Sequence, residues 1–143
     1  AALDGFDVTL CHNPDYANGL STSLNRGLAA LPRDTEAALV CLGDMPRIEA
    51  SHLDRLIAAF DPVEGRSICV PTHGGKRGNP VLFAERFFSE MQEVRGDVGA
   101  RHLIGEYGEE VCEVEMNHAG VLTDVDSPDA LAAVRAAVLE PAI

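Results

Sequence analysis

The sequence predicts a three-layer α/β domain with a mostly parallel sheet. Apolar runs typical of buried strands alternate with segments of roughly ten residues whose apolar side chains recur every three or four positions. The chain has 143 residues, 46% of them hydrophobic, which suffices for one domain with its own core. Alternating strands and helices imply βαβ units, whose parallel strands bind ligands at their carboxyl ends. We therefore expect the loops after Cys11, Leu42, Val70 and Val125 to converge.

The first elements are a short strand at 7–11, a helix over about 21–31 and a strand at 38–42. Leucines spaced by three or four residues mark the apolar face of this helix: Leu20, Leu24, Leu28 and Leu31. Ser51 offers the N-cap of the next helix, and a strand at 67–70 follows it. The apolar face of this second helix consists of Leu53, Leu56, Ile57 and Phe60.

The second half of the chain continues the alternation. A short strand at 81–83 leads to a helix over 84–93, and another helix begins inside 96–101 and carries Leu103 and Ile104 inward. Strands are expected at 111–116 and 121–125. Ser127 then provides an N-cap and Pro128 fits the first turn of the last helix. Its apolar face contains Leu131, Val134 and Val138.

Charge and cysteine content restrict the class of protein. Eleven basic and 23 acidic residues give a net charge of −12, which argues against nucleic-acid and acidic-membrane partners. The four cysteines form no CxxC pair, so we expect free, buried thiols in a reducing compartment. No apolar run approaches the roughly 20 residues that span a bilayer, and no signal peptide is recognisable at the start. These features predict a cytoplasmic protein.

The first candidate for chemistry is Asp44, two residues after the end of the predicted strand at 38–42. A carboxylate at the carboxyl end of a strand lies where α/β sheets bind ligands. The alternative is that Asp44 merely caps the following helix.

Three further loops contain residues suited to phosphate or metal. The segment 13–23 places a glycine and three hydroxyl residues at a helix start, although a simple capped helix would look similar. The segment 72–80 combines three glycines with Lys76 and Arg77, which an exposed hairpin tip would also explain. The segment 96–101 places Asp97 and Arg101 one turn apart, either as an anion site or as a helix-stabilising pair.

Asp124 and Asp126 end the predicted strand at 121–125. Because alternate side chains point to opposite faces, we expect only one of them to meet Asp44. Paired carboxylates from different strand ends suit Mg²⁺, which prefers oxygen ligands and substrate phosphates. The five histidines show no metal-binding spacing and are interpreted as structural or surface residues, with His73 alone placed to touch a ligand.

Four short motifs resemble, in order, those of the molybdenum cofactor nucleotidyltransferases, and are most similar to the cytidylyltransferase branch. They are LGDMP at 42–46, RGNPVLF at 77–83, GDVGAR at 96–101 and DVDSP at 124–128. The resemblance implies a Rossmann-like enzyme that joins CTP, or alternatively GTP, to the terminal phosphate of molybdopterin and releases pyrophosphate. It implies that the pterin phosphate attacks the α-phosphorus, without a nucleophilic side chain.

The resemblance also implies roles for individual residues. Asp44 would bind the catalytic Mg²⁺, and Asp124 or Asp126 would complete the metal site, with Asp44 and Asp126 as the catalytic pair. The residues expected to face the nucleotide are Asn13, Gly19, Ser21, Ser23 and Gly43. The residues expected to face the pterin are Lys76, Arg77, Gly78, Asn79, Pro80, Asp97 and Arg101.

The chain departs from this family in two places. Asn79 stands where the branch often has histidine, which leaves hydrogen bonding but removes proton transfer. The opening Gly-rich loop, of the type Leu-Ala-Ala-Gly followed by Arg and Lys, has no counterpart before Asp7. We therefore expect residues 1–143 to be the carboxyl-terminal part of a single nucleotidyltransferase domain, truncated at its amino terminus and inactive alone.

The truncation and the family suggest partners, and two other functions stay open. An exposed sheet edge would favour association with a second copy or another chain. A fused molybdopterin-binding domain and a molybdoenzyme that accepts the product are also expected from the family. The alternatives are a nucleotidyltransferase for another phosphorylated acceptor and a noncatalytic cofactor carrier. Whether the parent gene encodes the Gly-rich loop with its lysine discriminates between enzyme and carrier.

Overall fold

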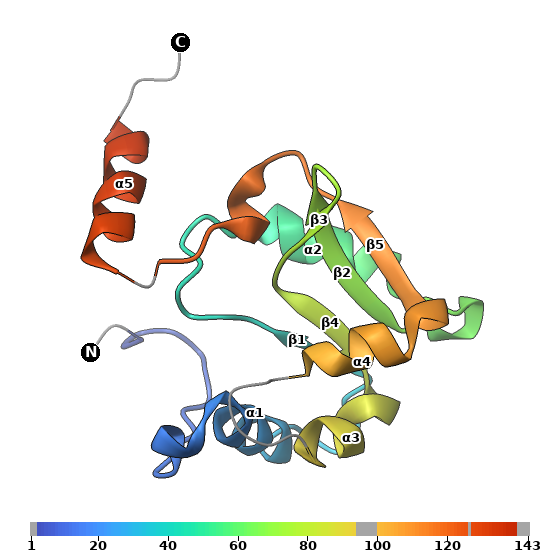
Figure 1. The fold of residues 1–143 in the computed structure, drawn as a ribbon. Coiled ribbons are helices and arrows are strands. Elements are labelled where there is room, and N and C mark those ends of the chain that lie inside the picture. The colour runs from blue at the N-terminus through green and yellow to red at the C-terminus, as the bar shows by residue number, and fades with distance from the viewer. Residues whose placement is uncertain (1–2, 94–99, 126, 140–143) are drawn as a thin grey trace. The chain divides into compact units, whose positions relative to one another are not determined.

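The computed structural model describes residues 3–93, 100–125 and 127–139 (Figure 1). The chain divides into two compact units. Unit 1 comprises Ala1–Ala38 and Ala84–Gly108, and unit 2 comprises Leu39–Phe83 and Glu109–Ile143. Asp97 and Asp126, two of the predicted site residues, lie outside the described residues.

A five-stranded sheet has the order β1-β4-β2-β3, with β5 on β2 as well. The strands are β1 (Ala37–Val40), β2 (Ile68–His73), β3 (Lys76–Arg77), β4 (Val81–Ala84) and β5 (Val111–Glu115). The apolar, largely β-branched run of β2 explains its central place, since its first five residues are all buried. Figure 1 shows β2 in green beside β5 in orange.

The α/β fold class is confirmed, and the sheet is mixed. β2 pairs in parallel with β5, from Ile68 opposite Val111 to Thr72 opposite Glu115. It pairs antiparallel with β4 at its start and with β3 at its end. The parallel pairing expected from the alternation of elements therefore holds for β2 and β5. On the other side of β2, both β3 and β4 are antiparallel to it.

Helix α2 (Ala50–Ala59) packs against β2 and β5 and buries Leu56 completely. Its N-cap is Glu49, so the prediction of Ser51 was wrong by two residues. The Glu49 carboxylate accepts from the His52 backbone N–H, and the His52 ring accepts from the Glu49 N–H. This reciprocal pair satisfies two of the donors that a helix start leaves free, which the serine two residues later cannot do. The buried face of α2 contains His52 and Leu56 and differs from the predicted apolar face, because Ile57 is exposed.

The strand predicted at 121–125 is not formed. Residues Ala119–Leu122 form the 3₁₀ helix η5, capped by the His118 side chain, which accepts from the Gly120 N–H. The Val121 carbonyl is used elsewhere, accepting from the Asn79 N–H at 2.9 Å. A local cap and a tertiary contact thus override the β-branched composition of this segment.

The strand predicted at 7–11 is also absent, because no described segment pairs with it. Val8 donates its N–H locally to the Phe6 carbonyl, and Val8 and Leu10 are 52% and 74% exposed. A strand needs a neighbouring ladder for its backbone groups, and an apolar sequence alone does not supply one.

Unit 1 consists mainly of helices: η1 (Tyr16–Asn18), α1 (Leu20–Ala29), η3 (Glu85–Phe87), α3 (Phe88–Glu93) and α4 (Arg101–Glu106). α1 packs on α3, and the Asn25 side chain donates to the Gln92 carbonyl. Leu103 and Met91 are completely buried, and Phe87 stacks against Tyr107 with ring centroids 5.0 Å apart. The predicted helices at 21–31 and 84–93 and the inward-facing Leu103 and Ile104 are confirmed.

The last helix, α5 (Pro128–Leu139), begins as predicted. The Ser127 hydroxyl accepts from the Ala130 N–H at 3.1 Å, and Pro128 is the first helical residue. Leu131, expected on a buried face, is 37% exposed. Among helices over the described parts of the chain, none is both long and apolar enough to cross a membrane.

All four cysteines are free, as predicted, but they differ in burial. Cys69 in β2 is completely buried, and burial is the main cause that raises its pKa to about 11. Cys11 and Cys41 are exposed, so the prediction of buried thiols fails for these two. The two short apolar runs that contain them do not enter the core.

Candidate functional site

Asp44 lies in the loop between β1 and α2 and is not a helix cap, since Glu49 fills that place. The neighbouring Met45 is buried and holds the loop in place. Asp44 Oδ1 is also buried, and it accepts no hydrogen bond from any part of the chain that the structure describes. A buried oxygen without a donor costs about 1–3 kcal/mol, and more when charged. The loop thus holds an acceptor that a cation or a ligand donor would satisfy.

The segment that carries Asp124 meets the Asp44 loop directly. The Val125 N–H donates to the Asp44 backbone carbonyl at 2.6 Å. Asp124 itself is exposed. The expected approach of these two loops is therefore found, although their roles in metal binding stay predictions. Ser127 caps α5 on its own, so the cap of this helix does not require Asp124.

The Gly78-Asn79-Pro80 motif packs against the same segment. Gly78 donates to the Pro71 carbonyl at 2.8 Å, and Asn79 donates its backbone N–H to Val121. A Cβ atom on Gly78 would lie only 2.0 Å from the Val121 carbonyl oxygen. Only glycine permits this approach, which brings the motif beside the segment leading to Asp124.

The two cations of this loop lie on the short strand β3 and are exposed. Arg77 Nε donates to Glu113 Oε1 at 2.8 Å, with both side chains about half exposed. An exposed pair of this kind contributes little stability, so a phosphate could replace the carboxylate as its partner. His73 makes a hydrogen bond through Nδ1 to the Met116 carbonyl at 2.9 Å, and its contact with a ligand stays a prediction.

Gly43 is exposed beside Asp44 in unit 2, and the remaining candidates belong to unit 1. Asn13 Nδ2 donates to both Thr22 Oγ1 and Ser23 Oγ at 2.9 Å, which ties the loop to the start of α1. Gly19 is the N-cap of α1, with φ of 114°, and no side chain caps this helix. Ser21 is buried, and Arg101 is exposed at the start of α4. Thr22, one of the three hydroxyl residues at this helix start, is thus bonded to a predicted site residue although it is not itself one of the predicted site residues.

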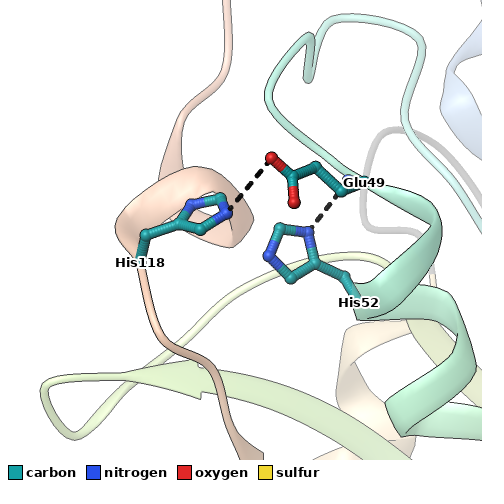
Figure 2. A group of neighbouring side chains, drawn as sticks. All are labelled: Glu49, His52 and His118. Carbon is teal, nitrogen blue, oxygen red and sulfur yellow. Dashed lines mark hydrogen bonds and ion pairs between the residues drawn. The ribbon is translucent and has the colours of Figure 1, made fainter. Parts of the chain in front are cut away.

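Glu49, His52 and His118 form a cluster that the sequence did not reveal (Figure 2). His118 Nε2 lies 3.8 Å from Glu49 Oε1, and the two imidazole rings are 4.4 Å apart and edge to face. One ligand atom from each residue falls within 4.8 Å of the others, which is close enough for a metal ion to be considered. In the sequence, the Glu49-x-x-His52 spacing is a signal for the capping box. The sequence contains no comparable signal that His118 joins this pair.

The hydrogen bonds of both rings argue against a ready metal site in the Glu49–His52–His118 cluster. Nδ1 of His52 accepts from the Glu49 N–H at 2.9 Å, and Nδ1 of His118 accepts from the Gly120 N–H at 3.0 Å. A neutral imidazole that accepts at Nδ1 carries its hydrogen at Nε2. Both Nε2 atoms are therefore donors. A metal could bind at Nε2 only if each ring lost the hydrogen bond that it accepts at Nδ1.

The buried imidazole of His52 makes stability depend on pH. Burial, followed by the nearby His118, lowers the His52 pKa below its ordinary 6.5, and Arg55 acts in the same direction against Glu49. The unfolded chain therefore binds the proton first, and stability is lost as pH falls below 6.5. His52→Gln keeps a capping acceptor but does not titrate. In urea titrations between about pH 8 and 5, this variant should lose less stability than the wild type. Parallel curves would contradict the assignment, and the exposed His102→Gln is the matched control.

Comparison with known proteins gives matches over most of the chain. The family model described as a MobA-like NTP transferase domain matches residues 1–111. Molybdenum cofactor cytidylyltransferase of Escherichia coli (strain K12) is 27% identical over 125 residues, which cover 86% of this chain and 60% of that protein. Purine catabolism protein PucB of Bacillus subtilis (strain 168) is 28% identical over 127 residues, which cover 87% of this chain and 60% of that protein.

A solved structure is similar in fold as well as in sequence. The crystal structure of Rv0371C from Mycobacterium tuberculosis H37Rv, in complex with manganese, superposes with a TM-score of 0.68 at 26% identity. The match covers 78% of this chain and 58% of that one. The chain thus spans about three fifths of the length of the curated relatives that it matches.

Proposed function

Because the chain belongs to the MobA-like NTP transferase domain family, we propose that it is part of a nucleotidyltransferase that releases pyrophosphate. The proposed donor is CTP and the proposed acceptor is the terminal phosphate of molybdopterin, in line with the name of the Escherichia coli relative. One observation carries the proposal: the buried, unsatisfied Asp44 Oδ1 lies in a strand-end loop that contacts the segment presenting Asp124. Such a position suits a carboxylate that acts through a bound ion.

The residues present fit a divalent cation, and Mg²⁺ is the proposed one. Asp44 would hold it together with Asp124 or Asp126, since hard cations take carboxylate oxygens. When bound, such an ion neutralises charge on the phosphate oxygens of the nucleotide. The manganese complex of the similar solved structure supports a divalent metal in this kind of protein.

The chain's own residues would bind and orient the two substrates. Transfer between phosphates needs positioning and charge neutralisation more than a covalent side chain. Gly78 and Asn79 lie against the segment that leads to Asp124, which supports the proposal that they face the acceptor. The Asn79 amide can donate and accept hydrogen bonds but cannot carry a proton between substrates. The acceptor phosphate is therefore proposed to attack directly.

A second candidate differs only in the acceptor. The Bacillus subtilis relative, named for purine catabolism, is as similar to this chain as the cytidylyltransferase is. A nucleotidyltransferase acting on another phosphorylated acceptor is therefore the second candidate function. A noncatalytic carrier is disfavoured because the buried Asp44 oxygen would have no use without a cation or donor.

The proposed function is tested by pyrophosphate release from the full-length gene product. It is given molybdopterin and Mg²⁺ with each nucleoside triphosphate separately, and CTP alone is expected to support release. Release with GTP alone would replace the donor, and release only with other phosphorylated acceptors would favour the second candidate. No release from a folded full-length product under any of these conditions would overturn the proposal.

A further inference from the structure

Two segments that carry the proposed metal ligands run side by side in opposite directions. At one end, the Val125 N–H donates to the Asp44 carbonyl. In the middle, a Cβ atom on Gly120 would lie 2.7 Å from the Arg47 carbonyl oxygen, so the backbones are in close contact. At the other end, His118 faces Glu49. The loop 44–49 is thus held along its length by the segment 118–125.

Only the last of these three contacts is made entirely by side chains. Glu49 ends the Asp44 loop as the N-cap of α2, and His118 begins η5 as its cap. Figure 2 shows the Glu49 carboxylate beside both rings, with a dashed line joining it to His118 of the other segment. His118 Nε2 is buried and has no hydrogen bond of ordinary length, so the carboxylate 3.8 Å away is its principal polar neighbour among the described residues.

The direction of the hydrogen bonds explains how the cluster joins the segments. Each ring accepts a backbone N–H of its own segment at Nδ1, which fixes the ring and leaves an N–H at Nε2. The Glu49 carboxylate is an acceptor with several lone pairs and already receives the His52 N–H. The carboxylate therefore attracts the His118 Nε2–H of the other segment. The buried His52 ring packs against the His118 ring.

We propose that Glu49, His52 and His118 are positioning residues that hold the Asp44 loop against the Asp124 segment and thereby set the affinity for the divalent cation. This inference rests on the proposed function, because the cation would bind between Asp44 and that segment. The cluster acts through the backbone of the two segments and does not itself bind the metal.

Two conservative variants separate this role from simple stability. His118→Asn keeps a side-chain oxygen to cap η5, but its shorter amide lacks the ring N–H at Nε2 that faces Glu49. Glu49→Gln keeps an acceptor for the α2 cap but removes the negative charge. Mn²⁺ is titrated into the full chain, and the free ion is followed by electron paramagnetic resonance. Each variant should raise the Kd by about tenfold with one binding equivalent retained, as for other groups that orient metal ligands. The double variant should add little, because both remove one contact.

Matched controls and the Asp44→Asn variant make the outcome decisive. Exposed Asp54→Asn on α2 and exposed His102→Asn on α4 should leave the Kd unchanged. A Kd within twofold of wild type for both folded test variants, while Asp44→Asn loses binding, would overturn the positioning role alone. A loss of one metal equivalent at unchanged Kd would mean that the cluster is itself a metal site, which also overturns it. If Asp44→Asn leaves binding intact, the proposed metal site fails and the positioning role with it.

Discussion

Asp44→Asn is expected to slow pyrophosphate release by about a thousandfold while leaving the protein folded. Asparagine has nearly the same shape, but it removes the negative charge and places an amide group where a cation would bind. The contact between Asp44 and Val125 uses backbone atoms only, so the substitution leaves it in place. The assay compares wild type and variant in the full-length product with Mg²⁺ and CTP.

Stability measurements distinguish a lost metal ligand from a damaged fold. Without divalent cation, the free energy of unfolding should stay equal or rise by about 1 kcal/mol, because Asp44 Oδ1 has no donor to lose. Adding Mn²⁺ should raise the Tm of the wild type but not of the variant. Asp54→Asn, with the same charge change at an exposed position, should behave like the wild type in both assays. Full activity of Asp44→Asn would rule out the proposed role of this carboxylate.

Gly78→Ala is expected to lower the free energy of unfolding by about 3 kcal/mol. The new Cβ would lie 2.0 Å from the Val121 carbonyl oxygen and 2.7 Å from its carbon. Both atoms are backbone, so no side-chain rotation relieves the clash. The Asn79–Val121 hydrogen bond would break as the loop moves away. Because this loop lies against the segment leading to Asp124, pyrophosphate release should fall as well.

The matched control for stability is Gly43→Ala. A Cβ atom at Gly43 meets no atom within 4 Å, and its φ is not positive. Urea titrations of the two variants should therefore show a large loss for Gly78→Ala and a change within about 0.5 kcal/mol for Gly43→Ala. Equal stability of the two variants would show that the close approach at Gly78 relaxes without cost.

The expectation that ligands bind at the carboxyl ends of strands predicts Asp44 from the sequence alone. Asp44 was singled out because it ends a buried run, and its loop does meet the segment carrying Asp124. The strand predicted at 7–11 was wrong, because the sequence has the composition of a strand but no described segment pairs with it. The family resemblance drawn from four short motifs is confirmed by the match to residues 1–111.

The Glu49–His52–His118 cluster could not be predicted in the same way. Ser51 has the stronger intrinsic preference for an N-cap, and only the folded chain shows that Glu49 and His52 cap the helix reciprocally. His118 belongs to a segment predicted as the approach to a strand, and its partner lies far away in the sequence. A side-chain contact between distant segments leaves no periodic pattern to detect.

The sequence by itself determined the α/β class, the existence of the strand β2, the main helices, the cap at Ser127 and the family. These follow from periodicity, local capping chemistry and short motifs, all of which depend on residues near one another in the chain. Only the tertiary structure decided that the sheet is mixed, that 119–122 is a 3₁₀ helix and that Gly78 must be glycine. Each of these depends on backbone atoms from distant segments that share hydrogen bonds or van der Waals contact, which local sequence does not encode.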